Sequence, residues 1–188
     1  MTRIQKRGWQ RVFKVKSYWE YKREKKRVKA EFEELELDPK AKPIKIGIVG
    51  EIYSIIEPFV NQEIEQALGD LGVEVHRGVN LSYFVTEFLY KKKEKKKAEP
   101  YLKHIVGGHG LASVAHTLEY YEKGYDGVIH MAVFGCMPEV SIRPILTKIS
   151  RQKNFPLISL SLDEHSGKAG IQTRVEAFVD LIRNKIKG

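Results

Sequence analysis

Cysteine is nearly absent from this 188-residue sequence, which contains only Cys136. A single thiol excludes a disulfide within the chain, and it excludes a metal site built from several thiolates of one chain. Long apolar runs are also lacking, since no stretch reaches the roughly 18 residues that a membrane-spanning helix needs. The N-terminus carries Arg3, Lys6 and Arg7 without the apolar core of a signal peptide. We therefore expect a cytoplasmic protein with no membrane among its partners.

Several catalytic motifs are missing as well. The sequence has no Walker loop and no dinucleotide fingerprint, so we predict no ATP site and no nucleotide hydrolysis. The Ser-His-Asp order and the nucleophile elbow of hydrolases are not recognised either, which disfavours a hydrolase.

Positive charge is concentrated in two segments. Residues 1–29 hold twelve Lys and Arg against two Glu, a net charge of +10, and residues 91–97 hold six Lys against one Glu, a net charge of +5. The rest of residues 44–188 carries thirteen basic and sixteen acidic residues. The overall charge of +9 therefore belongs to two surface segments, and it is weak evidence for nucleic-acid binding.

Residues 10–37 contain neither Gly nor Pro and predict one helix or two in succession. Asp38-Pro39 and Lys42-Pro43 end this segment, because the residue before Pro avoids the helical conformation. We expect a basic helical arm in residues 1–40 and a separate domain in residues 41–188. The arm has the charges to pair internally, to dock on the domain, or to cover a surface that another polypeptide normally covers.

Aromatic residues among the bases of the arm raise the possibility of nucleic-acid binding, since bases and rings together contact phosphates and stack on nucleobases. These residues are Trp9, Tyr18, Trp19 and Tyr21. Their spacing equally suits one buried helix face with solvated lysines around it. We favour the buried face over a nucleic-acid partner, since no nucleic-acid motif accompanies the charge.

From Ile44 onwards, strand-like segments alternate with helix-like segments. Short apolar runs predict strands over residues 44–50, 73–76, 124–134 and 155–162. Amphipathic patterns predict helices over residues 59–71, 111–123, 139–151 and 170–186, with a helix or an excursion over 80–99. This alternation predicts an α/β, Rossmann-like, mostly parallel sheet flanked by helices.

Three loops that follow predicted strands carry polar or reactive residues. They are residues 50–58, 134–139 and 163–170. Ligand groups gather where parallel strands end, so we expect these loops to share one rim of the sheet. Glu51, in the first loop, is a candidate ligand-binding residue.

Cys136 is the candidate metal ligand. It follows an apolar strand and precedes Pro138, which opens a helix. The N–H groups and the macrodipole at a helix N-terminus favour a thiolate, the form that attacks electrophiles or binds iron. A lone cytosolic cysteine is often a small buried hydrophobe. The loop position favours a function for this one.

Asp163, Glu164 and His165 follow the last predicted strand and are the candidate catalytic residues. They are suited to acid–base chemistry. Alternatively, Asp163 and Glu164 could organise His165 and the loop. An equally weighted interpretation is that these short polar residues cap the next helix.

Gly107, Gly108, His109 and Gly110 precede a predicted helix and are candidate cofactor-binding residues, because glycines let backbone amides approach an anion. Such a group is more often simply a turn. The remaining histidines lack metal-ligand spacing, and we interpret them as structural or exposed. They are His76, His104, His116 and His130.

Four stretches together carry a family resemblance. They are IKIGIVGEIYSIIEPFVNQEIEQALGDLGVEVHR, VGGHGLASVAHT, GYDGVIHMAVFGCMPEV and SLDEHSGKAGIQTRVEAFVDLIR. From about Lys45 to Arg183 the chain resembles the C-terminal half of the CoA protein activase group, of the 2-hydroxyacyl-CoA dehydratase D-component superfamily. The CMPE and DEHSGKAG segments are its most specific parts. The resemblance implies a component of an anaerobic iron–sulfur system, in which cysteines hold a 4Fe-4S cluster and electrons pass singly, with Cys136 as a cluster ligand.

The N-terminal half of that family, with its own cysteines, has no counterpart in this sequence, and the activase's ATP-binding elements are missing too. One thiolate cannot hold a cubane cluster, which takes four ligands. If a cluster is bound, the resemblance therefore implies a cysteine-rich partner subunit or a homo-oligomer. We expect no turnover by the isolated chain. If it is part of an enzyme, that enzyme is a lyase of the acyl-CoA dehydratase type, or the chain belongs to the electron-transfer component of such an enzyme. The open alternatives are a non-catalytic module that binds an anion or an acyl-CoA, and nucleic-acid binding through the arm.

Overall fold

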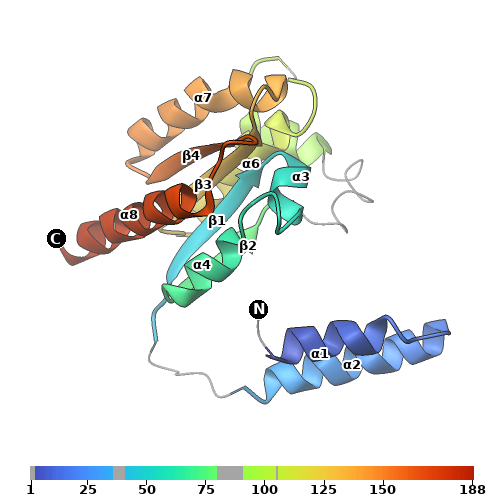
Figure 1. Cartoon of the computed structure of the whole chain (residues 1–188). Helices are drawn as coiled ribbons and strands as arrows, with labels where there is room; N and C mark the ends of the chain where they lie inside the picture. Colours follow the sequence, from blue (N-terminus) through green and yellow to red (C-terminus); the bar gives the residue numbers. More distant parts are fainter. Residues whose placement is uncertain (1–2, 36–40, 80–90, 105) are drawn as a thin grey trace. The chain divides into compact units, whose positions relative to one another are not determined.

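The computed structural model describes residues 3–35, 41–79, 91–104 and 106–188. The chain divides into two units, Met1–Lys42 and Pro43–Gly188, so the division falls within two residues of the expected boundary (Figure 1). Residues 80–90 of the segment expected as a helix or an excursion lie outside the described residues, and residues 91–98 are helical.

The N-terminal unit is a helical hairpin. Helix α1 (Arg3–Val12) and helix α2 (Tyr18–Glu33) lie side by side and are joined by a turn (Figure 1). The Ser17 hydroxyl accepts a hydrogen bond from the Glu20 N–H at 3.2 Å, and the Glu20 carboxylate accepts one from the Lys16 N–H at 2.9 Å. This pair of hydrogen bonds caps the start of α2 and resembles a capping box, with the carboxylate bonded to the residue before the N-cap. The arm is therefore two helices in succession.

The predicted buried aromatic face of the arm is wrong. The seam between α1 and α2 is formed by Gly8 against Val28, with Arg11 paired to Glu24 and Glu31 at 3.3 and 2.8 Å. A Cβ at Gly8 would lie 3.1 Å from Val28, so the glycine permits the close approach. The four aromatic residues are left on the outside of the hairpin, all exposed: Trp9, Tyr18, Trp19 and Tyr21.

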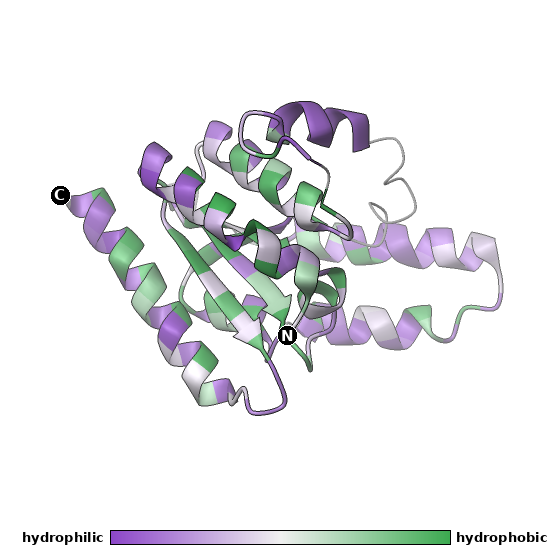
Figure 2. Ribbon diagram, turned by 90° about the horizontal axis from the view of Figure 1, so that it is seen from above, coloured by the Kyte–Doolittle hydropathy of each residue, from purple (hydrophilic) through white to green (hydrophobic). Residues whose placement is uncertain are grey.

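The second unit is an α/β domain around a four-stranded, fully parallel sheet in the order β2-β1-β3-β4. The strands are β1 (Ile44–Gly50), β2 (Val73–Arg77), β3 (Gly127–Val133) and β4 (Leu157–Leu162). All four predicted strands are present, and the predicted Rossmann-like α/β class is confirmed. In Figure 2 the strands are largely hydrophobic, as expected of a parallel sheet covered on both faces.

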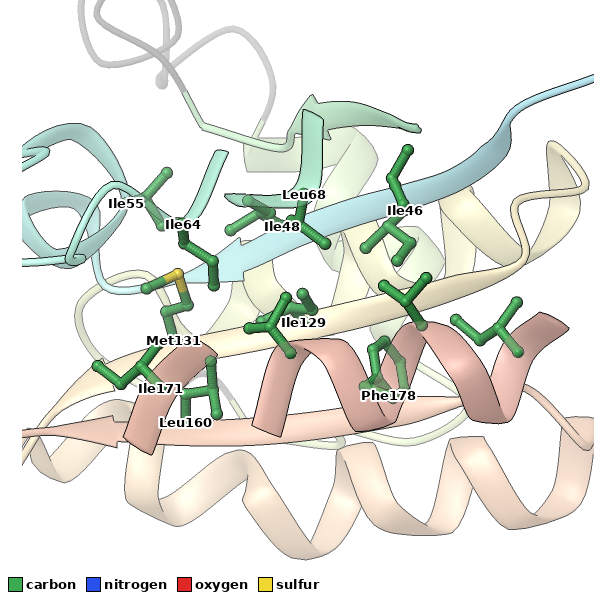
Figure 3. Close-up of a cluster of buried hydrophobic side chains, with 14 of the residues drawn as sticks. Ile46, Ile48, Ile55, Ile64, Leu68, Ile129, Met131, Leu160, Ile171 and Phe178 are labelled. Atoms are coloured by element: carbon green, nitrogen blue, oxygen red, sulfur yellow. The ribbon is translucent and has the colours of Figure 1, made fainter. Parts of the chain in front are cut away.

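Helices cover both faces of the sheet. They are α3 (Ile52–Ile56), α4 (Ile64–Asp70), α6 (Gly110–Glu122), α7 (Met137–Lys153) and α8 (Lys168–Lys187). Figure 3 shows the core on one face, where Ile48, Ile129 and Leu160 of the strands meet Phe178 of α8. Helices α6 and α7 pack together on the other face, around Val114 of α6 and Leu146 of α7.

One helix boundary differs from the prediction over residues 59–71. Gln62 and Glu63 have positive φ angles of 56° and 58°, so the chain turns there and α4 begins only at Ile64. The short helix α3 lies inside residues 50–58, which were expected to form a loop. Both differences depend on contacts in the folded domain, which the spacing of apolar residues along the sequence does not reveal.

Candidate functional site

The carboxyl ends of β1, β3 and β4 are neighbours. The register pairs Gly50 of β1 with Met131 of β3, and Val133 of β3 with Leu162 of β4. The loops after these strands therefore lie along one edge of the sheet, as expected, and we term them the carboxyl rim (residues 50–58, 134–139 and 163–170). After β1 the chain proceeds to β2, and after β3 it proceeds to β4 on the other side. Parallel sheets bind ligands at such a reversal of strand order.

Glu51 ties the first rim loop to the sheet. Its carboxylate accepts hydrogen bonds from the N–H groups of Tyr53 and Ser54 at 2.9 and 2.8 Å, so it is the N-cap of α3. Its own N–H donates to the Met131 carbonyl at 3.0 Å. Gly50 has a φ of 137°, and a Cβ there would overlap the Met131 carbonyl oxygen. The structure thus assigns Glu51 a capping contact, and its binding of a ligand stays a prediction.

Cys136 is the N-cap residue of α7, a helix of 17 residues. Gly135, with a φ of 81°, turns the chain after β3, and the Cys136 N–H donates to the Val133 carbonyl at 3.1 Å. The cysteine is a half-buried free thiol whose side chain makes no capping hydrogen bond. It therefore lies on the carboxyl rim rather than in the core. On the rim, a reagent or another chain is able to reach it. Its role as a metal ligand stays a prediction.

Large apolar side chains of the carboxyl rim are exposed. Phe134 and Met137, which flank Cys136 along the chain, are 74% and 71% exposed. The segment after β1 adds Tyr53, in α3, and Phe59, directly after the rim residues 50–58, and both are exposed. Exposed apolar side chains that gather in one region are typical of contact surfaces. We term these four residues the rim apolar patch.

A buried hydrogen-bond network lies in the first turn of α7, and the sequence analysis missed it. The Glu139 Oε2 atom is 2.9 Å from His130 Nε2 and 3.1 Å from the Ser113 hydroxyl. Both His130 and Glu139 are essentially inaccessible to solvent. His130 Nδ1 lies 3.1 Å from the Ser159 hydroxyl, so the network joins α6, α7, β3 and β4.

This network fixes the turn that carries Cys136. A buried carboxylate is tolerated only where hydrogen-bond donors surround it, and Ser113 and His130 supply them. The position in the first turn of a long helix also suits a negative charge. One signal was present in the sequence, namely a polar residue, His130, in the middle of an otherwise apolar strand. Its partner three residues after Cys136 could not be identified without the fold.

The Asp163 loop has two kinds of residue. The Asp163 carboxylate accepts hydrogen bonds from the His165 N–H at 3.0 Å and from the Ser166 hydroxyl at 2.9 Å, which closes the turn after β4. Glu164 and His165 extend into solvent, with side chains more than four-fifths exposed. Asp163 thus organises the loop, as one expected role has it, whereas the expected capping of the next helix is wrong, because the N-cap of α8 is Gly167 and no side chain caps it. Acid–base chemistry by Glu164 or His165 stays a prediction.

The glycine group lies against the cysteine loop. A Cβ at Gly108, whose φ is 58°, would lie 3.0 Å from Pro138, and one at Gly110 would lie 3.1 Å from the Pro138 carbonyl oxygen. Close packing against the start of α7 therefore explains Gly108 and Gly110, whereas a Cβ at Gly107 would meet no atom within 4 Å. Gly107, Gly108 and Glu94 also line a cavity of about 60 Å³. Its wall contains the Lys91 ammonium as well as the Glu94 carboxylate, so the cavity does not decide for or against an anion, and binding of an anion by residues 107–110, His109 included, stays a prediction.

The donor set for an iron–sulfur cluster is incomplete in one copy of the chain. Cys136 is the single cysteine of the sequence. Among the residues that the structure describes, no group of three or more His, Cys, Asp or Glu is placed to hold a metal ion. Cys136 is thus suited to be one ligand of a cubane cluster, which needs four, and the other three have to come from elsewhere.

No protein-family model and no curated protein matches this chain. The family resemblance therefore rests on the motifs of the sequence alone. Within the described ranges, no helix combines the length and the apolar character that crossing a bilayer requires.

Proposed function

We propose that this chain is a component of a 2-hydroxyacyl-CoA dehydratase-type iron–sulfur system of the cytoplasm, in which Cys136 supplies one ligand to a site completed by another polypeptide. The observation that carries the proposal is the position of the lone thiol. It lies on the carboxyl rim, half-buried, at the N-terminus of a 17-residue helix. A thiol at the rim of the sheet, rather than inside the core, is placed where a second polypeptide can share it.

Two further observations support the proposal. The CMPE and DEHSGKAG segments, which carry the family resemblance, follow the paired strands β3 and β4 and are neighbours on the rim. The rim apolar patch offers a contact surface of the kind that a second polypeptide covers. A bound cluster would supply one-electron transfer. The residues of this chain would hold one corner of it, with Glu139 and His130 fixing the helical turn that presents the thiol.

Anaerobic reconstitution with ferrous iron and sulfide tests this proposal. The chain is reconstituted alone and after co-expression with a cysteine-rich polypeptide from a neighbouring reading frame. Iron per chain, the electron paramagnetic resonance spectrum and co-purification are measured. We expect a cluster in the complex, or in a dimer of this chain if two copies share the site, and none in the monomer.

Two variants separate ligation from docking. Cys136→Ser is expected to preserve co-purification and to lower the iron content or change the spectrum. The double variant Phe134→Ser/Met137→Ser keeps the thiol and is expected to weaken co-purification, because it removes apolar contact area. Unchanged iron content and an unchanged spectrum in Cys136→Ser would show that the ligand role is wrong.

A further inference from the structure

The closed end of the N-terminal hairpin, residues 9–22, carries four aromatic side chains that are more than half exposed, and Tyr21 in the same segment is 41% exposed. Trp9, Phe13, Tyr18 and Trp19 are 51%, 81%, 65% and 76% exposed, whereas Phe32 at the open end is 40% exposed. Large aromatic residues dominate burial energetics and are costly to leave in water. Their concentration at one end of the hairpin marks that end as a contact surface.

The four rings form two pairs on the outside of the hairpin. Trp9 and Phe13 stack with ring centroids 5.6 Å apart. The Lys22 ammonium lies over the rings of both Tyr18 and Trp19, 5.2 and 5.6 Å from their centroids. The surface therefore combines apolar area with a positive charge that is held against it.

The acidic residues of the hairpin do not neutralise this end. Glu24 and Glu31 are turned into the seam, where both pair with Arg11. Glu20 accepts a hydrogen bond from the Lys16 backbone at the start of α2. The outward-facing charges around the aromatic residues are basic, and all are exposed: Lys14, Lys16, Lys22, Lys25 and Lys26. Figure 2 shows the hairpin as mainly hydrophilic, with its hydrophobic residues in short patches.

We propose that this closed end binds the surface of an anionic lipid bilayer. Trp and Tyr favour the boundary between headgroups and acyl chains, and Lys side chains reach from there to lipid phosphates. Basic residues near an anionic membrane surface strengthen binding, and a few buried rings add to this. The contact is peripheral, since none of the described helices is able to cross a bilayer. The proposal departs from the expectation of no membrane partner, which was based on the lack of a spanning segment and did not consider a peripheral contact.

The arrangement favours a bilayer over a nucleic acid. A single-stranded nucleic acid needs rings spaced along a basic groove, with free faces on which bases stack. In this hairpin the most exposed rings gather at one end, rather than along the basic face of α2 that continues to Lys29. Lys22 already covers two of the rings, and the other two stack on each other. A bilayer requires no free ring face. The inference is independent of the proposed iron–sulfur role.

Tryptophan fluorescence of the full chain tests the proposal, because Trp9 and Trp19 are its only two tryptophans. The emission is recorded with vesicles of phosphatidylcholine alone and with vesicles containing 30% phosphatidylserine, together with co-sedimentation. We expect co-sedimentation and a blue shift with the phosphatidylserine vesicles, both reduced by added salt and much weaker with phosphatidylcholine alone.

Two variants and a matched control locate the contact. Lys14→Glu/Lys22→Glu and Phe13→Ser/Tyr18→Ser keep both tryptophans, and each is expected to lower vesicle partitioning by about tenfold or more. Lys95→Glu/Lys96→Glu makes the same charge change at exposed lysines of the α/β domain and is expected to partition as the unmodified chain does. Far-ultraviolet circular dichroism confirms that each variant remains helical.

Three results would overturn the proposal. The first is no binding of the full chain to phosphatidylserine vesicles. The second is an equal loss of binding in the Lys95→Glu/Lys96→Glu control, which would place the contact elsewhere. The third is quenching of both tryptophans by a 30-nucleotide poly(dT) that also displaces the chain from vesicles, which would assign the surface to nucleic acid.

Discussion

Two carboxylate–imidazole pairs include residues of the carboxyl rim. They differ in exposure and in the distance between their partners. Glu139 and His130 are 2.9 Å apart with side-chain exposures of 1% and 0%, whereas Glu164 and His165 are 3.8 Å apart with exposures of 83% and 87%. Water screens the exposed pair, so it contributes little to stability. The buried pair has lost its hydration and depends on its hydrogen bonds. The same two residue types therefore fix structure in one place and remain available to solvent in the other.

The difference also bears on the proposed function. Glu139 lies one helical turn after Cys136, so its hydrogen bonds to His130 and Ser113 hold the segment that presents the thiol. Glu164 and His165 extend from a turn that Asp163 and its neighbours close without their side chains. The residues that hold the segment around Cys136 are thus different from the residues predicted to do acid–base chemistry.

The largest expected effect comes from removing the buried carboxylate. Glu139→Ala leaves His130 and Ser113 without their acceptor in a region closed to water. Leaving one buried hydrogen-bonding group without its partner costs about 1–3 kcal/mol, and two such groups are affected, so we expect a loss of about 2–6 kcal/mol in the free energy of unfolding. Urea denaturation followed by circular dichroism measures it.

Glu164→Ala is the matched control, since it removes the same side chain from the exposed pair. We expect a change within about 0.5 kcal/mol. Similar losses in the two variants would mean that burial does not distinguish the pairs, and the comparison would fail.

The sequence predicted the sheet well because its strands leave local marks. Each is a short apolar run bounded by turn residues, and the alternation with helices predicts parallel pairing. Helices α6, α7 and α8 also begin and end within a few residues of the prediction, since their apolar positions recur every three to four residues. Both patterns are local in the sequence, so they can be recognised without knowing which distant residues are in contact.

The network around Glu139 leaves no such mark. His130 and Ser113 meet it across 9 and 26 residues of sequence, and only the packing of α6 and α7 on β3 brings them together. The exposed aromatic residues of the hairpin were misjudged for a related reason. Helical spacing predicts that side chains share a face, but a glycine seam at Gly8 decided which face is buried. Partners distant in sequence, rather than local patterns, set both outcomes.

An intermediate effect is expected at Asp163, which closes the turn beneath the exposed pair. Asp163→Ala removes the acceptor of the His165 N–H and of the Ser166 hydroxyl. Loss of a comparable capping side chain costs about 0.5–2 kcal/mol, so we expect a value in this range. Urea denaturation gives the loss, and amide hydrogen exchange at His165 is expected to accelerate. Asp163→Asn keeps one acceptor oxygen and is expected to lose less, and an equal loss in both variants would show that the hydrogen bonds are not the cause.

The smallest effect is expected at a third pair, Glu74 and His76 of β2, which are 2.7 Å apart and about two-fifths exposed. The hydrogen bond from His76 lowers the pKa of Glu74 below its ordinary value of 4.5, partial burial opposes this, and the charge of Lys45 adds to the lowering. A carboxylate whose pKa is lower in the folded state stabilises the fold above pH 4.5, and this contribution is lost as the pH falls through the folded-state pKa. After screening by water it amounts to about a few tenths of a kcal/mol. Glu74→Gln should therefore lower the free energy of unfolding by about that amount at pH 7 and by less near pH 3, measured by urea denaturation at each pH. A larger loss in acid than at neutrality would contradict the sign, and a loss as large as that of Glu139→Ala would show that exposure does not rank the three pairs.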